Sequence, residues 1–343
     1  MPATLAHLQL QPDPEPPEAS ALDDAGAGEP MVGATVSAEA GDPEQTGEQA
    51  ALRKVTLYHF PTSLSSQQVR LALAEKGVVW EDRVVNIGPA HEQYEPWYAK
   101  LNPKLVVPTL EVEGTIVNDT VDIIRFIDQA FPGPSLLPRD PAQREEVLEW
   151  VGRQDRFPLR ELSFSRAKGL VRWFERWTLD QRRKRLRKLQ KKHPELRELY
   201  LGKLEQLEQF AAAVKDRALG DQLINEVEDL LDEFEERLQD RDWLAGDEYT
   251  LADLVWTVTL ARLDHIGFGR SLGERRRPRV ADWYRRLRER ASWGVGIRRL
   301  SAGQWLRFYG PAVAKTFAVA WVVKWAVLTP LIYWLTSVLN CGG

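Results

Sequence analysis

Hydroxyl side chains cluster between an apolar stretch, Val55–Phe60, and a helix predicted at Gln67–Lys76. Ser63, Ser65 and Ser66 stand in this turn. Such hydroxyls ordinarily cap a helix, because they accept hydrogen bonds from its free amides. A hydroxyl at a helix N-terminus can also donate to the sulfur of a bound thiol and stabilise the reactive thiolate. The turn predicts a cap or a thiol-activating site, and Ser65 and Ser66, nearer the helix start, are expected to be caps.

Periodicity predicts the elements that must position this turn. Val55–Phe60 alternates apolar and polar residues as a strand does, and Gly77 is expected to stop the helix that follows. The other predicted elements are a strand at Trp80–Ile87, a hairpin of Thr109–Val112 and Thr115–Val117, and a helix at Val121–Phe131. The order is strand, helix, strand, hairpin and helix, which predicts a small α/β domain.

Helical patterns dominate the remainder of the chain, after a proline-rich linker that ends at Asp140-Pro141. Thr250 and Asp253 have the spacing of a capping box and are expected to open one of these helices. The other predicted helices are Ala142–Leu162, Leu170–Lys192, Glu195–Val214, Leu223–Leu238 and, as the last soluble helix, Trp283–Arg290.

Composition limits the possible functions. The first 50 residues contain no Lys or Arg and are rich in Pro, Ala and Gly, so residues 1–52 are expected to form a disordered acidic tail without a targeting signal. The net charge of −4 argues against a nucleic-acid partner. The only cysteine is Cys341, which excludes an internal disulfide and fits a reducing compartment. The histidines show no metal-ligand spacing.

A basic segment lies between Arg166 and Lys192, where twelve Lys and Arg residues face only two acids, Glu175 and Asp180. Trp173 and two other aromatic residues are interleaved near its start. The pattern fits a solvated helix with one packed side, or a surface for anionic lipid or an acidic protein. Nucleic acid is disfavoured because the rest of the chain is not basic.

An apolar run from Thr316 to Leu339 carries one charge, Lys324. Roughly 20 residues span a bilayer as a helix, and four Trp and Tyr residues in the run suit the lipid interface. Lys324 costs about 2.5–3.5 kcal/mol at mid-membrane, less if it snorkels. Residues 311–340 are therefore expected to anchor the chain in a membrane; the alternative is a buried amphipathic helix.

The first domain resembles glutathione transferases. The resemblance rests on VTLYHFPTSLSSQQVRLALAEK at 55–76 and LVVPTL at 105–110. It implies that Ser63 activates the thiol of glutathione, that Val107 and a cis Pro108 hold its cysteinyl backbone, and that Asp119 and Thr120 hold its γ-glutamyl group. One departure is the loop of residues 102–105, which lacks the glycine that follows Asn-Pro-x in the family and contains Lys104, a possible carboxylate partner.

Most of residues 55–340 resembles the ganglioside-induced differentiation-associated protein 1 family. The matching stretches are those at 57–77, 95–102, 250–268 and 277–287. This resemblance implies a glutathione-transferase-like protein on the cytosolic side of the outer mitochondrial membrane, which regulates mitochondrial fission and redox state with little or no catalysis. The alternatives are an active membrane-held glutathione S-transferase that conjugates glutathione to apolar electrophiles, and residence in the endoplasmic reticulum. A homodimer is possible in this fold.

The predicted fold is therefore a thioredoxin-like α/β N-terminal domain, an all-α glutathione-transferase C-terminal domain and a C-terminal transmembrane helix. The expected boundaries are 53–132 for the first domain, 133–300 for the second, with a basic insertion at about 163–220, and 311–340 for the membrane anchor.

Overall fold

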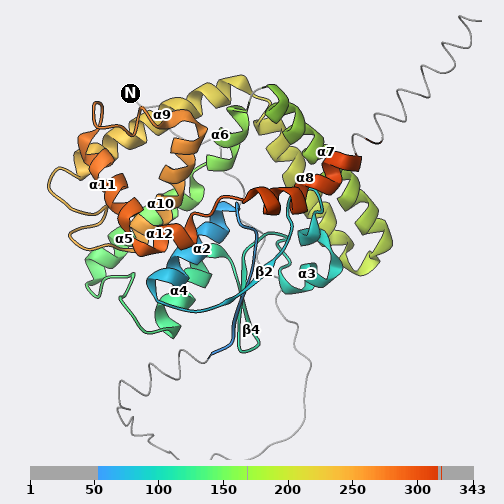
Figure 1. Cartoon of the computed structure of the whole chain (residues 1–343), viewed down its shortest axis with the longest axis horizontal. Helices are drawn as coiled ribbons and strands as arrows, with labels where there is room; N and C mark the ends of the chain where they lie inside the picture. Colours follow the sequence, from blue (N-terminus) through green and yellow to red (C-terminus); the bar gives the residue numbers. More distant parts are fainter. Residues whose placement is uncertain (1–52, 168, 316–317, 319–343) are drawn as a thin grey trace, which may run out of the picture. The chain divides into compact units, whose positions relative to one another are not determined.

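A four-stranded mixed sheet begins the part of the chain that the computed structural model describes, which is residues 53–167, 169–315 and 318 (Figure 1). The strand order is β2-β1-β3-β4. Strand β1 (Val55–His59) is parallel to β2 (Glu81–Val84) and antiparallel to β3 (Thr109–Val112), which pairs in turn with β4 (Thr115–Asn118).

Helices cover both faces of this sheet, and β1 is therefore buried throughout its length. Val55 and Leu57 belong to the main hydrophobic core, with residues of α2 (Leu64–Glu75) and α4 (Thr120–Ala130). Tyr58 points to the opposite face, as strand alternation requires, and meets Tyr98 of α3 (Pro96–Leu101). A short 3-10 turn, η1 (Glu92–Tyr94), precedes α3. The predicted thioredoxin-like arrangement is confirmed.

Helices make up the second domain. In its core, the ring centroid of Phe234 lies 5.0–5.4 Å from those of Trp150, Trp256 and Trp283. The helices are α5 (Pro141–Arg156), α6 (Leu159–Ser165), α7 (Gly169–Lys192), α8 (Arg197–Ala213), α9 (Arg217–Arg237), α10 (Leu251–Leu263), α11 (Pro278–Glu289) and α12 (Ala291–Gly296). Two shorter elements, η2 (Pro194–Leu196) and η3 (Asp264–Phe268), precede α8 and follow α10. Residues 302–315 are also helical.

Three predictions for the helices of the second domain differ from the structure. The segment Ala142–Leu162 is two helices, because Phe157 is extended before Pro158, and proline disfavours a helical residue before it. Helix α9 begins at Arg217 rather than Leu223, since the Asp216 side chain caps it. Trp283–Arg290 is not the last soluble helix, because α12 and the helix at 302–315 follow it.

The predicted basic insertion is a helix pair that packs against the first domain. Helices α7 and α8 share a hydrophobic cluster with Tyr94, Ala99 and Leu105 of that domain. Tyr200 of α8 donates a hydrogen bond to the carbonyl of Tyr94 at 2.9 Å, and Arg185 of α7 forms an ion pair with Glu95. The two helices are therefore part of the folded body and brace the region around α3.

The predicted membrane anchor lies almost wholly outside the described residues. Within residues 53–167, 169–315 and 318, no helix is long and apolar enough to cross a bilayer. Residues 311–315 belong to the helix at 302–315, and the apolar run from Thr316 to Leu339 is not described apart from residue 318. The predicted disordered tail at 1–52 also lies outside the described part.

Candidate functional site

Strand register brings the predicted site residues to one end of the sheet. Tyr58 in β1 pairs with Thr109 in β3, and Thr109 pairs with Asn118 in β4. The turn that carries Ser63 follows β1, residues 107–108 precede β3, and residues 119–120 follow β4. Because β3 is antiparallel to both of its neighbours, all three segments meet at the same end of the sheet, which is called the sheet edge below.

Ser63 is the residue that caps α2. Its Oγ accepts a hydrogen bond from the backbone N–H of Ser66 at 3.4 Å, and its backbone is extended. The expectation that Ser65 and Ser66 are the caps is wrong, because the helix begins at Leu64 rather than Gln67 and Ser66 is buried within it. A capping hydroxyl uses an oxygen lone pair and keeps its hydrogen, so Ser63 can cap α2 and still donate to a thiolate.

A buried asparagine shapes the loop before β3. The Asn102 side-chain amide donates to the carbonyl of Val106 at 2.9 Å and to the hydroxyl of Thr109 at 3.1 Å. Its Oδ1 accepts from the Lys104 backbone at 3.0 Å. The Val107-Pro108 bond that follows is cis, as the family resemblance implies. These contacts of Asn102 are not visible in the sequence pattern, where Asn102 stands only as the start of a motif that lacks its glycine.

Leu105 occupies the position of that missing glycine and has the backbone conformation that glycine favours. Its φ is +55°, which costs a residue with a side chain roughly 1–2 kcal/mol. Its side chain is only 1% exposed and lies in the cluster formed with α7 and α8. Burial of a leucine side chain stabilises by about 1.5–3 kcal/mol, which offsets the backbone cost. Packing against α7 and α8 therefore stabilises a leucine at a position where the family has glycine.

Asp119 caps α4 from a strained backbone. Its φ is +78°, its carboxylate accepts from the N–H of Val121 at 3.1 Å, and Lys104 Nζ lies 3.4 Å from its other oxygen. Thr120 is the first residue of the helix. Limited solvation and then the Asp119 charge raise the pKa of Asp155 at the end of α5. The second domain thus contributes a carboxyl group beside the predicted γ-glutamyl site, which the sequence pattern did not indicate.

Arg70, fully buried in α2, ties the Ser63 turn to the far end of the chain. Its Nη2 donates to the carbonyls of Pro61 at 2.9 Å and Gly296 at 2.6 Å. Its Nη1 lies 3.0 Å from Nδ1 of His59, and because a guanidinium only donates, this nitrogen must accept. Burial, together with the Arg70 charge, lowers the pKa of His59 although Asp82 opposes the change, so the imidazole is neutral.

The helix at 302–315 packs over the same end of the sheet. The Phe308 ring lies 5.4 Å from the ring of Phe60, three residues before Ser63. Phe308 and Tyr309 join a cluster with Phe60 and Val107, and Tyr309 also meets Phe174 of α7. Figure 1 shows this segment, in red, reaching α7. No pattern in the sequence predicted that Phe308 and Tyr309 would reach the candidate site.

Family models match both domains of the chain. The model for the N-terminal domain of glutathione S-transferase matches residues 57–135, and the model for the C-terminal domain matches residues 203–286. Residues 136–202, which include α7, lie between the two matches.

Curated relatives align over about 70% of the chain. Tetrachloro-P-hydroquinone reductive dehalogenase of Sphingobium chlorophenolicum is 32% identical over 240 residues, which are 70% of this chain and 94% of that protein. Ganglioside-induced differentiation-associated protein 1-like 1 of Homo sapiens is 29% identical over 269 residues, 69% of this chain and 71% of that protein. The predicted resemblance to this second group is confirmed.

Solved structures share the fold. Beta-etherase LigF from Sphingobium sp. strain SYK-6 covers 70% of this chain and 97% of its own, with a TM-score of 0.55 and 24% identity. Glutathione transferase F7 from Populus trichocarpa covers 71% of this chain and all of its own, with a TM-score of 0.53 and 20% identity.

Proposed function

Because this chain belongs to the glutathione S-transferase family, we propose that it is a membrane-held member that regulates mitochondrial membrane dynamics and redox state with little or no catalysis. Similarity to ganglioside-induced differentiation-associated protein 1-like 1 supports this choice over that of an ordinary soluble transferase. The resemblance described from the sequence implies a position on the cytosolic side of the outer mitochondrial membrane.

One observation carries the proposal, namely the position of the helix at 302–315. Its residue Phe308 packs on Phe60 beside the Ser63 turn, and the same helix leads directly into the apolar run that begins at Thr316. A transferase needs open space next to its thiol site for an electrophile. A helix that covers part of this region limits that space and links the site to the predicted membrane segment.

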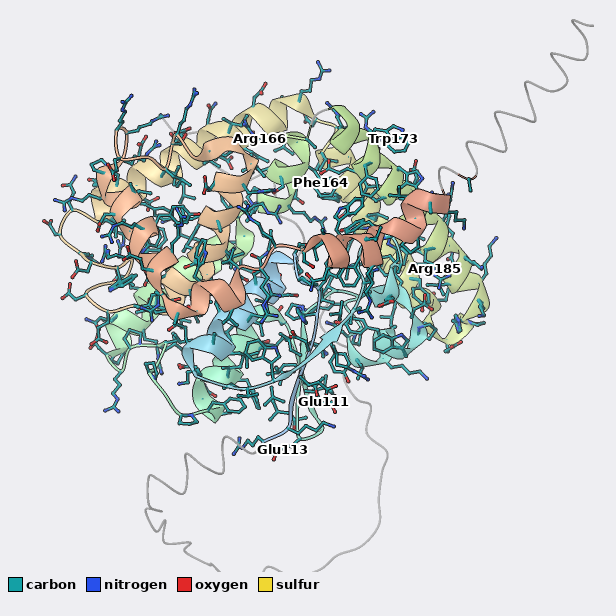
Figure 2. All side chains as sticks on the ribbon, in the orientation of Figure 1. Glu111, Glu113, Phe164, Arg166, Trp173 and Arg185 are labelled. Carbon is teal, nitrogen blue, oxygen red and sulfur yellow. The ribbon has the colours of Figure 1, made fainter. Side chains whose placement is uncertain are left out.

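Exposed aromatic and aliphatic side chains near that helix support contact with a membrane. Trp305 is 48% exposed and Leu306 is 65% exposed, both on the helix at 302–315. Trp173 on the basic helix α7, labelled in Figure 2, is 52% exposed. Tryptophan favours the boundary between headgroups and acyl chains. These residues would place the start of the predicted anchor at the bilayer surface.

Glutathione suits the residues at the sheet edge as a ligand. Two helix N-termini, those of α2 and α4, meet there, and each carries partial positive charge. The Ser63 hydroxyl can donate to a thiolate, and the free amides of α4 near Thr120 can hold a carboxylate. Oδ2 of Asp119, which does not cap α4, lies 3.4 Å from Lys104 Nζ, and its remaining lone pair can accept from the amino group of a γ-glutamyl residue. Bound glutathione would make the protein responsive to the thiol pool.

Replacing Asp119 by alanine is expected to weaken glutathione binding at least tenfold, because it removes the acceptor for the amino group. Calorimetry on the full chain in a non-ionic detergent measures this. Asp140→Ala is the matched control, because Asp140 caps α5 in the same way, with 2.9 Å from Oδ2 to the N–H of Gln143. Asp140→Ala should lose about 1 kcal/mol of stability. Asp119→Ala should lose roughly 1–2 kcal/mol more, because alanine is disfavoured at a φ of +78°, and only Asp119→Ala should lose affinity. Equal affinities in both variants would contradict this site.

Removal of residues 311–343 is expected to abolish the effect of the expressed protein on mitochondrial network shape, whereas Ser63→Ala should keep it. Fluorescence microscopy of cells that express each variant measures both network shape and location. A shape change that survives the deletion contradicts a membrane-held regulator. If Ser63→Ala abolishes it and also abolishes conjugation of glutathione to an apolar electrophile, the protein is instead an active transferase. Residence in the endoplasmic reticulum would overturn the mitochondrial assignment.

A further inference from the structure

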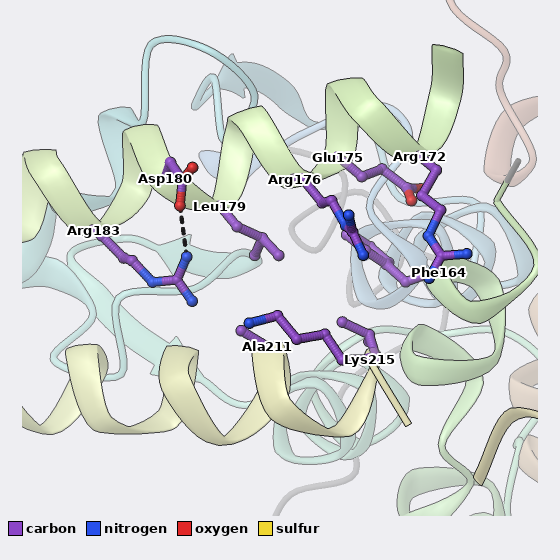
Figure 3. Close-up of a pocket in the computed structure, with 10 residues that line it drawn as sticks. Phe164, Arg172, Glu175, Arg176, Leu179, Asp180, Arg183, Ala211 and Lys215 are labelled. Carbon is purple, nitrogen blue, oxygen red and sulfur yellow. Dashed lines mark hydrogen bonds and ion pairs between the residues drawn. The ribbon is translucent and has the colours of Figure 1, made fainter. Parts of the chain in front are cut away.

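A cavity of about 260 Å³ lies between the two helices of the basic insertion (Figure 3). Its walls are formed by α6, α7 and the end of α8. None of its lining residues belongs to the candidate glutathione site. Its polar lining includes Arg172, Arg176, Arg183 and Lys215, and its apolar lining includes Phe164 and Leu179. A volume of this size is small for a drug-like molecule and suits one compact polar group with a short apolar stem.

Helical spacing explains why the charged groups converge. Arg172 and Arg176 are one turn apart on α7, and Leu179 and Arg183 continue the same face. Figure 3 shows the side chains of Arg176, Arg183 and Lys215 extending into the gap between the helices. Like charges one turn apart repel each other and destabilise a helix. This arrangement is therefore not explained by helix stability, and an anion between the two arginines would relieve the repulsion.

Two acids neutralise only one of the cations. Arg183 pairs with Asp180 at 2.7 Å and with Glu208 at 2.8 Å. Among the described residues, no direct ion pair joins Arg172, Arg176 or Lys215 to an acid. The cavity therefore keeps an excess of positive charge beside a partly apolar wall.

Packing between the two helices does not require these cations. The shared core of the insertion is built by Leu186 and Leu189 of α7 against Leu207 and Phe210 of α8. Lys184 and Lys188 are exposed on α7 and do not line the cavity. Arg172 and Arg183 are half-buried, and together with the exposed Arg176 and Lys215 they line the cavity between α7 and α8.

Glu175 is the one acid of the cavity without a salt-bridge partner among the described residues. Burial raises its pKa to about 7, although Arg172 opposes the change. A neutral carboxyl donates a hydrogen bond, which an anionic oxygen accepts. The other charged groups that line the cavity include no histidine; they are Arg172, Arg176, Asp180, Arg183 and Lys215.

We propose that this cavity binds a phosphate monoester, with Arg172 and Arg176 as paired donors, Lys215 as an added positive charge and the Glu175 carboxyl as a further hydrogen-bonding group. Arginine forks match phosphate geometry, and the wall formed by Phe164 and Leu179 accommodates the carbon stem of the ester. The phosphate belongs either to a soluble ester or to the headgroup of a lipid. The proposal does not depend on glutathione binding or on any action on organelles.

Titration calorimetry on the full chain in a non-ionic detergent tests the site with two probes, glycerol 3-phosphate and dioctanoyl phosphatidic acid. Arg172→Gln with Arg176→Gln should weaken binding of the preferred probe at least tenfold. The matched control is Lys184→Gln with Lys188→Gln, which removes the same charge from the exposed side of α7 and should change affinity less than twofold. A tenfold preference for phosphatidic acid identifies a lipid headgroup, and equal affinities identify a soluble ester. Absence of binding at millimolar probe, or equal losses in both double variants, overturns the site.

A pH series tests the part assigned to Glu175. Sulfate is the probe, because its charge does not change between pH 6 and pH 8. It should bind about fivefold more tightly at pH 6 than at pH 8, since the neutral carboxyl both donates and removes a competing charge. Glu175→Gln should abolish the difference. A difference that persists in Glu175→Gln overturns this role.

Discussion

Replacing Asp253 by alanine is expected to lower the free energy of unfolding by about 3–5 kcal/mol. Asp253 is fully buried at the start of α10, and its carboxylate accepts from Thr250 N–H at 3.0 Å, Leu244 N–H at 2.9 Å and Trp283 Nε1 at 3.0 Å. The Thr250 side chain completes the capping box. The Thr250 hydroxyl also donates to this carboxylate at 3.2 Å, so alanine would leave four buried donors without this acceptor, and each such loss costs about 1–3 kcal/mol.

Urea denaturation of the full chain in detergent, followed by far-UV circular dichroism, measures this loss. Asp253→Asn keeps the shape and one acceptor oxygen, so it should lie between the wild type and the alanine variant. Asp229→Ala on the exposed side of α9 is the control and should change stability by less than about 0.5 kcal/mol. A loss below about 1 kcal/mol in Asp253→Ala would mean that water or a neighbouring group replaces the carboxylate.

Asp253 also illustrates which features a sequence can reveal. The capping box is a local pattern of four residues, so the spacing of Thr250 and Asp253 was enough to predict it. The bond to Trp283 joins residues thirty positions apart and depends on how α10 and α11 pack. Strands and most helices were predicted for the same reason, because hydrophobic periodicity is local. The break at Pro158 was missed because the apolar pattern continues across it.

The candidate site likewise combines local motifs, which the sequence shows, with long-range contacts, which it does not. Ser63, Val107, Pro108, Asp119 and Thr120 belong to short motifs at the ends of predicted elements, and strand register then places them at one edge. Their roles toward glutathione stay predictions. The supporting contacts are long-range ones that sequence patterns do not show. Arg70 reaches Gly296, and Phe308 reaches Phe60 across most of the chain.

Acid should destabilise the junction between the first domain and the basic insertion, chiefly through His91. Its side chain is 3% exposed, and burial, with Arg182 and Arg185 of α7 nearby, lowers the pKa of His91 to about 4. An unfolded histidine titrates near 6.5. The unfolded chain therefore takes up the proton first, so the stabilisation is complete above pH 6.5 and is lost as pH falls toward 4. The loss between pH 7 and pH 5 is about 2 kcal/mol.

Replacing His91 by asparagine isolates this contribution, because asparagine does not titrate and tolerates the positive φ of 54° at this position. Urea denaturation at pH 7 and pH 5 measures the free energy of unfolding of each protein. Between these pH values the wild type should lose about 2 kcal/mol more of this free energy than His91→Asn does. The comparison is needed because Glu175, with its pKa raised to about 7, has the opposite pH dependence in both proteins. His265→Asn at an exposed position should match the wild type at both pH values. If His91→Asn and wild type change in parallel, the imidazole is protonated in the folded protein, and the packing of α7 against the first domain does not keep it neutral.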